Sequence, residues 1–205
     1  MESDLTSSST SKRIFDIFVS LYGISVLIPI GIIIALSIKI GSKGPIFYFQ
    51  KRVGLNGEDF SVFKFRTMYT GSDKKGLLTV GNDDSRITDV GSFLRKTKLD
   101  ELPQLFNVLI GDMSFVGPRP EVRKYVDLYT PEQLKVLTIR PGITDYASLE
   151  YINENEILGK SKDPEKSYIE EIMPAKLKLN MKYLAEKSLQ TDINIIWKTI
   201  TKIIK

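Results

Sequence analysis

A long apolar run lies near the start of the chain. Residues 17–38, with the sequence IFVSLYGISVLIPIGIIIALSI, contain no charged side chain. As one helix they would extend roughly 33 Å, at about 1.5 Å per residue, which is enough to cross the hydrocarbon core of a bilayer. Hydropathy alone therefore favours a single transmembrane helix.

Proline and charge positions suggest a second interpretation, a helix that enters the bilayer and returns to the same face. Pro29 lies near the middle of the run, where it removes a backbone hydrogen bond and favours a kink. Lys12 and Arg13 precede the run, and Lys39 and Lys43 follow it. A spanning helix usually has its excess of positive charge on one side only. The residues themselves leave the spanning and re-entrant helices equally open.

The residues before the run are polar and rich in serine. Residues 1–11 read MESDLTSSSTS, a composition that predicts a disordered leader. We therefore divide the chain into this leader, a membrane helix over residues 12–43 and a cytoplasmic domain over residues 44–205.

The pattern changes to short β-branched and aromatic runs after residue 44. Residues 45–54 (PIFYFQKRVG) and 58–68 (EDFSVFKFRTM) predict two strands joined by a turn at LNG. In the second strand Lys64 and Arg66 share one face. An ordinary solvated face is the simpler interpretation of this pair, and a clamp for a phosphate dianion is the functional one.

Helical periodicity follows in three segments. Residues 87–97 (ITDVGSFLRKT) predict a short helix capped by Thr88 or Asp89. Residues 99–112 predict a second helix, described below. Residues 189–205 are amphipathic and basic and carry Trp197, which suits a helix at the membrane interface as well as one docked on the core.

These elements together predict an α+β fold. It comprises an N-terminal re-entrant membrane helix, a small cytoplasmic helical domain with a short β-hairpin, and interfacial amphipathic helices.

Composition limits the available chemistry. The 205 residues are 42% hydrophobic, enough for a core, with a net charge of +4 and neither cysteine nor histidine. Thiol nucleophiles, disulfides, Cys/His zinc sites and imidazole bases are therefore excluded. The remaining carboxylates, cations and hydroxyls suit a hard, oxygen-bound metal such as Mg²⁺.

Two adjacent carboxylates open the second predicted helix, LDELPQLFNVLIGD. Pro103 is tolerated only in a first turn, which places Asp100 at or near the N-cap and Glu101 directly after it. A capping aspartate contributes about 1 kcal/mol and needs no other role. A helix N-terminus also binds phosphates, and an ionised aspartate there could hold Mg²⁺ and attack phosphorus. Glu101 could complete a metal shell or assist the leaving group.

Three arginines could neutralise phosphate oxygens. Arg95 lies shortly before the carboxylate pair, and Arg119 is held between two prolines in VGPRP. Arg140 repeats the Arg-Pro arrangement in RPGIT. A cation on such a rigid segment is pre-organised for a bidentate oxyanion.

In this order the segments resemble the small bacterial sugar transferases, the monotopic phosphoglycosyl transferases. The resemblance runs from about Lys12 to the C-terminus. It is carried by KRIFDI, the apolar run with Pro29, FKFRTM, FLRKTKLDELPQLFNVLIGDMSFVGPRP and RPGIT.

The resemblance implies a first helix that is re-entrant and broken near Pro29. It also implies transfer of a sugar 1-phosphate from a UDP-sugar to polyprenol (undecaprenyl) phosphate, releasing UMP, at the cytoplasmic face of the bacterial inner membrane. Asp100 would be the nucleophile that forms a covalent phosphosugar intermediate and a Mg²⁺ ligand, with Glu101 assisting. The product would enter surface glycan or glycoconjugate assembly by downstream glycosyltransferases.

The resemblance also implies substrate-binding residues. Arg95 and Arg119 match arginines that engage phosphates or nucleotide, and Lys64 and Arg66 match a basic strand motif. Arg140 joins these candidates. Partners would be the UDP-sugar, the polyprenol phosphate and membrane lipids; no nucleic-acid motif is visible.

One segment departs from the family pattern. After PGIT many relatives continue with Gly-Trp-Ala-Gln or similar, whereas this chain has DYASLEYINENEIL, residues 145–158. The sugar therefore does not follow from the resemblance. Two alternatives stay open: a membrane-anchored, Mg²⁺-dependent phosphatase, and a non-catalytic membrane scaffold in which Asp100 is only a helix cap.

Overall fold

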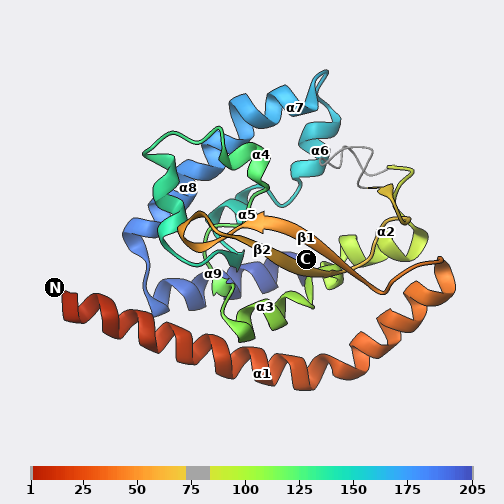
Figure 1. Ribbon diagram of the computed structural model, residues 1–205, viewed down its shortest axis with the longest axis horizontal. Coiled ribbons are helices and arrows are strands. Elements are labelled where there is room, and N and C mark those ends of the chain that lie inside the picture. The colour runs from red at the N-terminus through yellow and green to blue at the C-terminus, as the bar shows by residue number, and fades with distance from the viewer. Residues whose placement is uncertain (1, 73–83, 205) are drawn as a thin grey trace.

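The computed structural model describes residues 2–72 and 84–204. Helices, short strands and 3₁₀ turns alternate along the chain, as expected of an α+β fold. Figure 1 shows one long helix running beneath the other elements, with the strands at the centre and shorter helices on the far side.

The long helix is α1, Glu2–Gly41. Its part from Thr10 to Gly41 is the one helix in the described residues that is long and apolar enough to cross a membrane. In Figure 1 α1 is bowed, and both of its ends turn toward the side on which the remaining elements lie. The helix begins within the residues for which we predict a disordered leader, and Met1 lies outside the described residues.

Pro29 lies inside α1 and leaves the carbonyl of Ser25 without its usual helical donor. One turn earlier, the Ser25 hydroxyl donates to the carbonyl of Leu21, at 2.9 Å. Large apolar side chains along this helix are exposed, including Phe18, Val26 and Ile33. An exposed apolar surface of this size needs an apolar environment to cover it.

Charged residues near the start of α1 attach it to the other elements. Lys12 forms an ion pair with Asp192 of α9 (Leu189–Ile204), and the Asp192 side chain is only 2% exposed. Arg13 donates to two carbonyls near the end of α3 (Gln104–Ile110), at 2.6 and 2.8 Å. Asp16 is buried and accepts from the backbone N–H of Phe115. The KRIFDI segment therefore fixes the helix to the remainder of the protein.

The predicted hairpin is confirmed. Strand β1, Phe47–Val53, pairs antiparallel with β2, Asp59–Phe65, and Phe47 lies opposite Phe65. Asn56 and Gly57 have positive φ angles in the connection, as a tight hairpin turn requires.

A second strand pair was not expected from the sequence. Strand β3, Ser114–Val116, pairs parallel with β4, Gly142–Thr144. A Cβ atom at Gly142 would lie 2.1 Å from the backbone nitrogen of Gly117, so only glycine fits there. This close approach brings the two Arg-Pro segments side by side.

The helices around the carboxylate pair differ from the prediction in one respect. Helix α2, Asp89–Lys96, is capped by Thr88, whose hydroxyl accepts from the N–H of Gly91. Asp100, however, is not an N-cap: it lies in a 3₁₀ turn, η3, Leu99–Glu101, and Pro103 precedes α3, Gln104–Ile110. The helix therefore starts later than the periodicity suggested. Residues 99–101 form a separate turn, closed by a hydrogen bond from the N–H of Leu102 to the carbonyl of Leu99, and α3 begins after Pro103.

The remaining elements include α9, which contacts α1 through Asp192, and the helices on the far side of the hairpin. They are η1 (Leu55–Gly57), α4 (Arg123–Val126), η4 (Gln133–Thr138), α5 (Tyr146–Glu150), α6 (Glu154–Gly159), α7 (Pro164–Ser167), the π-helical turn η5 (Tyr168–Ile172), α8 (Met173–Glu186) and α9 (Leu189–Ile204). A hydrophobic core joins α4, η4, α6, η5 and α8.

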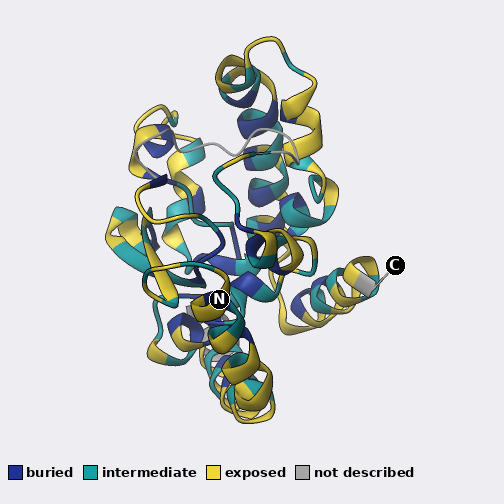
Figure 2. Cartoon of the chain, turned by 90° about the vertical axis from the view of Figure 1, so that its right-hand side faces the viewer, coloured by how far each residue is buried: buried dark blue, intermediate teal, exposed yellow. Residues whose placement is uncertain are grey.

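Helix α9 is amphipathic, as predicted. Ile195 is buried, whereas Ile193, Trp197, Ile200 and Ile203 are exposed. Figure 2 shows exposed residues along α1 and along α9, and buried residues gathered between the central elements. Both helices therefore present apolar side chains outward.

Candidate active site

A cavity of about 710 Å³ lies between the β1–β2 hairpin, η3 and the helices α5, α6 and α8. Six residues singled out from the sequence line it: Lys64, Arg66, Arg95, Asp100, Glu101 and Arg119. The fold thus brings together residues that lie far apart in the chain. A seventh candidate, Arg140, is absent from the walls described for this cavity.

Asp100 is a buried and incompletely paired carboxylate in this cavity. Its side chain is 8% exposed, and its Oδ1 atom has no hydrogen-bond partner among the residues that the structure describes. Lys98, two residues before Asp100, adopts a left-handed backbone conformation at the start of the η3 turn. An unpaired buried oxygen costs free energy, which a ligand in the cavity could recover.

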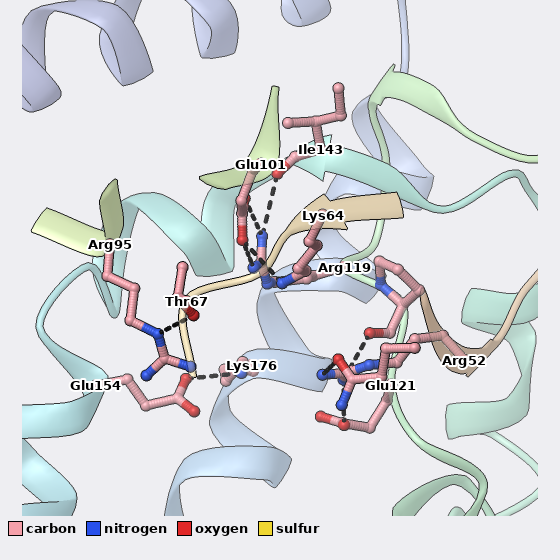
Figure 3. A network of polar contacts seen from close by, with 12 residues as sticks. Arg52, Lys64, Thr67, Arg95, Glu101, Arg119, Glu121, Ile143, Glu154 and Lys176 are labelled. Atoms are coloured by element: carbon pink, nitrogen blue, oxygen red, sulfur yellow. Dashed lines mark hydrogen bonds and ion pairs between the residues drawn. The ribbon is translucent and has the colours of Figure 1, made fainter. Parts of the chain in front are cut away.

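Glu101, in contrast, has strong partners on both sides. Its carboxylate accepts from Lys64 at 3.2 Å and forms a two-pronged ion pair with the guanidinium of Arg119 (Figure 3). Burial raises the pKa of Glu101, but the charges of Arg119 and Lys64 outweigh it and hold that pKa well below its usual range. Glu101 is therefore a permanent anion that orients two cations.

The pKa of Asp100 moves in the opposite direction. Burial raises the pKa of Asp100, and the charge of Glu101 adds to this effect, while Lys64, Arg95 and Lys98 oppose it. Burial also lowers the pKa of the Lys64 ammonium and of the Arg95 guanidinium. The site holds its charges in a poorly hydrated space, where electrostatic interactions are strong.

The balance of charge favours an anionic ligand. Lys64, Arg95 and Arg119 face the two carboxylates Asp100 and Glu101, which leaves an excess of positive charge. Arg95 also donates to the hydroxyl of Thr67 at 3.0 Å, which fixes its direction. Such an arrangement is typical of a site for phosphate groups.

Asp145 positions Arg119 and was not recognised as a site residue from the sequence. It is completely buried, and its Oδ2 accepts from the backbone N–H of Arg119 at 3.2 Å. Its Oδ1 accepts from the N–H of Ser148 at 2.6 Å and so caps helix α5. The local signal was present, because an aspartate before an apolar helical segment is a common N-cap.

Two predicted substrate residues have structural partners instead. The guanidinium of Arg66 donates to the carbonyls of Ser42, Lys43 and Pro45, at 2.6–3.0 Å, and so holds the end of α1 against the hairpin. Arg140 donates to the carbonyl of Gly111 at 2.8 Å. Arg66 also lines the cavity, and only the Nε of Arg140 makes this contact, so a substrate-binding role for either residue stays a prediction.

Two further charged groups of the cavity carried no signal in the sequence. Glu154 of α6 accepts from Lys176 of α8 at 2.7 Å (Figure 3). Glu121 pairs with Arg52 at 2.9 Å and also accepts from the hydroxyl of Tyr168. These contacts join segments that only the fold brings together.

The carboxylates of the cavity limit how a magnesium ion could be held. The described residues hold no group of three or more acidic side chains that could enclose a metal. Asp100 has a free oxygen, whereas the oxygens of Glu101 are taken by cations. Mg²⁺ commonly takes one or two carboxylates and fills its remaining positions with water and substrate phosphates, and Asp100 suits that arrangement.

Comparison with known proteins agrees with this geometry. The family model described as bacterial sugar transferase matches residues 7–205. The chain therefore belongs to the bacterial sugar transferase family.

Individual relatives include enzymes of different length. The UDP-N-acetylgalactosamine-undecaprenyl-phosphate N-acetylgalactosaminephosphotransferase of Aeromonas hydrophila is 36% identical over 94% of this chain. The UDP-glucose:undecaprenyl-phosphate glucose-1-phosphate transferase of Klebsiella pneumoniae is 36% identical over 93% of it. The chain spans 43% and 39% of these two relatives. The exopolysaccharide production protein PSS of Rhizobium leguminosarum is 38% identical, and the match covers 92% of each chain.

Proposed function

We propose that this protein transfers a sugar 1-phosphate from a UDP-sugar to undecaprenyl phosphate or a similar polyprenol phosphate. The observation that carries the proposal is Asp100, a buried carboxylate with an unpartnered oxygen beside three cations. The names of the relatives support the same reaction class, since two of them are undecaprenyl-phosphate transferases that differ in their sugar.

The proposed reaction has two displacement steps at one phosphorus atom. In the first, an oxygen of Asp100 attacks the phosphorus that carries the sugar. The bond from this phosphorus to the bridging oxygen breaks, and UMP leaves with the bonding electrons. In the second, an oxygen of polyprenol phosphate attacks the same phosphorus and releases Asp100 as a carboxylate.

The surrounding residues stabilise charge rather than move protons. Lys64, Arg95 and Arg119 neutralise the phosphate oxygens, and Glu101 holds two of these cations in place. A bound magnesium ion, held by Asp100, would neutralise further charge on the diphosphate. Both nucleophiles react as anions, a carboxylate and a phosphate, so neither displacement needs a histidine base to remove a proton.

We also propose that α1 is a re-entrant membrane helix, which places the cavity at the cytoplasmic face of the inner membrane. Its bowed course, the proline within it and the basic residues at both ends support this proposal. The exposed apolar residues of α9, among them Trp197, support an interfacial position for that helix. A water-soluble donor and a lipid acceptor could then meet in one cavity.

The first test is UMP release by the purified protein with Mg²⁺, undecaprenyl phosphate and a panel of UDP-sugars. We expect turnover with one or a few donors, and a mass increase of one sugar phosphate on Asp100 when the acceptor is omitted. Asp100→Asn should abolish both signals. Asp89→Asn, at an exposed aspartate outside the cavity, is the matched control.

Other outcomes identify the competing functions. Release of free sugar phosphate without acceptor would show a hydrolase. Full activity of Asp100→Asn would refute the proposed nucleophile, and folded protein without turnover of any donor would favour a scaffold.

A further inference from the structure

The end of the cavity formed by α5, α6 and α8 differs in chemistry from the end near Asp100. Polar residues of these helices line it, among them Ser148 on α5, Glu154 on α6, and Lys176 and Asn180 on α8. We call these four residues the α8 subsite. They lie largely within the segment that departs from the family pattern or directly against it.

The charges of the α8 subsite cancel. Lys176 and Glu154 pair at 2.7 Å, with side chains only 14% and 24% exposed. The ammonium of Lys176 also lies 5.3 Å from the centre of the Tyr168 ring, which limits its movement. In Figure 3 this pair lies apart from the ion pair of Glu101 with Arg119. Unlike the end near Asp100, this end carries no excess charge for a phosphate.

Two polar atoms of the α8 subsite have no partner. The Oδ1 of Asn180 and the Oγ of Ser148 are buried and form no hydrogen bond within the described part of the chain. Asn180 is 6% exposed, and Asn180 and Ser148 both line the cavity. Buried polar atoms are nearly always paired in a functional state, so a ligand with its own polar atoms is expected here.

We propose that the α8 subsite binds the hydroxylated sugar ring of the donor and determines which sugar is accepted. This inference rests on the proposed function, because it takes the donor to be a UDP-sugar. A sugar ring presents hydroxyl groups that both donate and accept hydrogen bonds and carry no charge. The subsite matches this with a carboxylate, an ammonium, an amide and a hydroxyl of zero net charge.

Other parts of the substrates fit this end less well. The diphosphate is better matched by the cations near Asp100, and a polyprenol chain would leave the buried oxygens of Asn180 and Ser148 unpaired. A uracil ring could accept from Lys176, but it offers one N–H to three acceptor side chains. The uridine position is therefore an outcome that the experiment must separate from the sugar position.

The test uses two variants that remove the unpartnered oxygens, Ser148→Ala and Asn180→Leu, of which the second also removes the amide nitrogen of Asn180. A purely structural role predicts unchanged or higher thermal stability and unchanged activity, because no existing hydrogen bond is lost. The sugar subsite predicts that kcat/KM for the preferred UDP-sugar falls about tenfold or more while poorer donors lose less. Its second prediction is that the affinity for UMP, measured by calorimetry, stays constant.

Lys176→Met tests the charged pair, and Lys182→Met is its matched control. Lys182 lies on the same helix and pairs with Glu186 at 4.0 Å in an exposed position outside the cavity walls. Lys176→Met should change the ratio of kcat/KM among donors, and Lys182→Met should not.

Each outcome is decisive. A weaker affinity for UMP together with an equal loss for every donor would place uridine in the α8 subsite and overturn the proposal. Unchanged donor ratios in all three cavity variants would also overturn it. If the unaltered protein binds no UMP and uses no donor, the proposed function itself fails, which is a different result from either.

Discussion

Replacing Glu101 with glutamine should reduce both the stability of the protein and the pH range over which it is active. Glu101 is the shared partner of Lys64 and Arg119, and its side chain is 14% exposed. Glu101→Gln keeps the shape and removes the charge, so two cations lose their counter-ion. Removing one partner of a buried ion pair costs about 3–5 kcal/mol.

The destabilisation expected for Glu101→Gln lies at the lower end of this range, because solvent reaches the ion pair. The Arg119 side chain is 35% exposed, so water screens part of its charge. We therefore expect a loss of about 3 kcal/mol in the free energy of unfolding, which lowers Tm by roughly 6–12 °C for a chain of this size. Thermal unfolding followed by circular dichroism in detergent measures this. Glu132→Gln, which removes one partner of the exposed pair with Lys135, should change Tm little.

The pH dependence of activity gives an independent readout. Burial lowers the pKa of Lys64, and the charge of Glu101 is the largest effect that opposes this. Phosphate binding needs the charged ammonium, so activity should fall as pH rises through the lowered pKa of Lys64. In Glu101→Gln the pKa of Lys64 should fall further, so the loss of activity on the alkaline side should occur at lower pH. An unchanged Tm together with an unchanged loss of activity on the alkaline side would refute the proposed role of Glu101.

Four other predictions concern the cavity and Asp145, which positions Arg119. Burial and the charge of Glu101 raise the pKa of Asp100, so activity should increase with pH through a value above that of an ordinary aspartate. The same raised pKa means that the ionised form destabilises the fold above that value, so Asp100→Asn should raise Tm at neutral pH and lose this advantage on acidification. Arg119→Lys cannot form the two-pronged contact with Glu101 and should lower kcat about tenfold or more with a folded protein, and an unchanged kcat would contradict this. Asp145→Ala removes two hydrogen bonds from backbone N–H groups, one of which caps α5, so Tm should fall by an amount equivalent to about 2–3 kcal/mol, and Asp145→Asn should recover part of it.

Local patterns in the sequence predicted the elements whose determinants are local. The hairpin followed from alternating residues and an Asn-Gly turn, and α9 from its amphipathic period. Thr88 was one of two proposed caps for α2, and it is the residue that accepts the hydrogen bond.

Contacts between distant segments could not be predicted in this way. The parallel pair β3–β4 consists of three-residue strands, which are too short to give a periodic signal. The partners of Glu154 and Arg66 are set by where α8 and the end of α1 lie, and neither position is encoded next to these residues. The sequence placed Asp100 at or near an N-cap because Pro103 is tolerated only in a first turn. The structure gives Asp100 a separate turn and leaves one of its oxygens unpaired.

The ion pair between Lys12 and Asp192 has a consequence for how the protein is made. The two residues are separated by 180 positions, so Lys12 leaves the ribosome long before its partner exists. Until α9 is synthesised, an ammonium next to an apolar helix has no buried counter-ion and remains hydrated at the membrane surface. Docking of α9 then neutralises it, which couples the seating of the first helix to the synthesis of α9. A nascent chain stalled before α9 should therefore be degraded or extracted from the membrane more readily than one stalled after it.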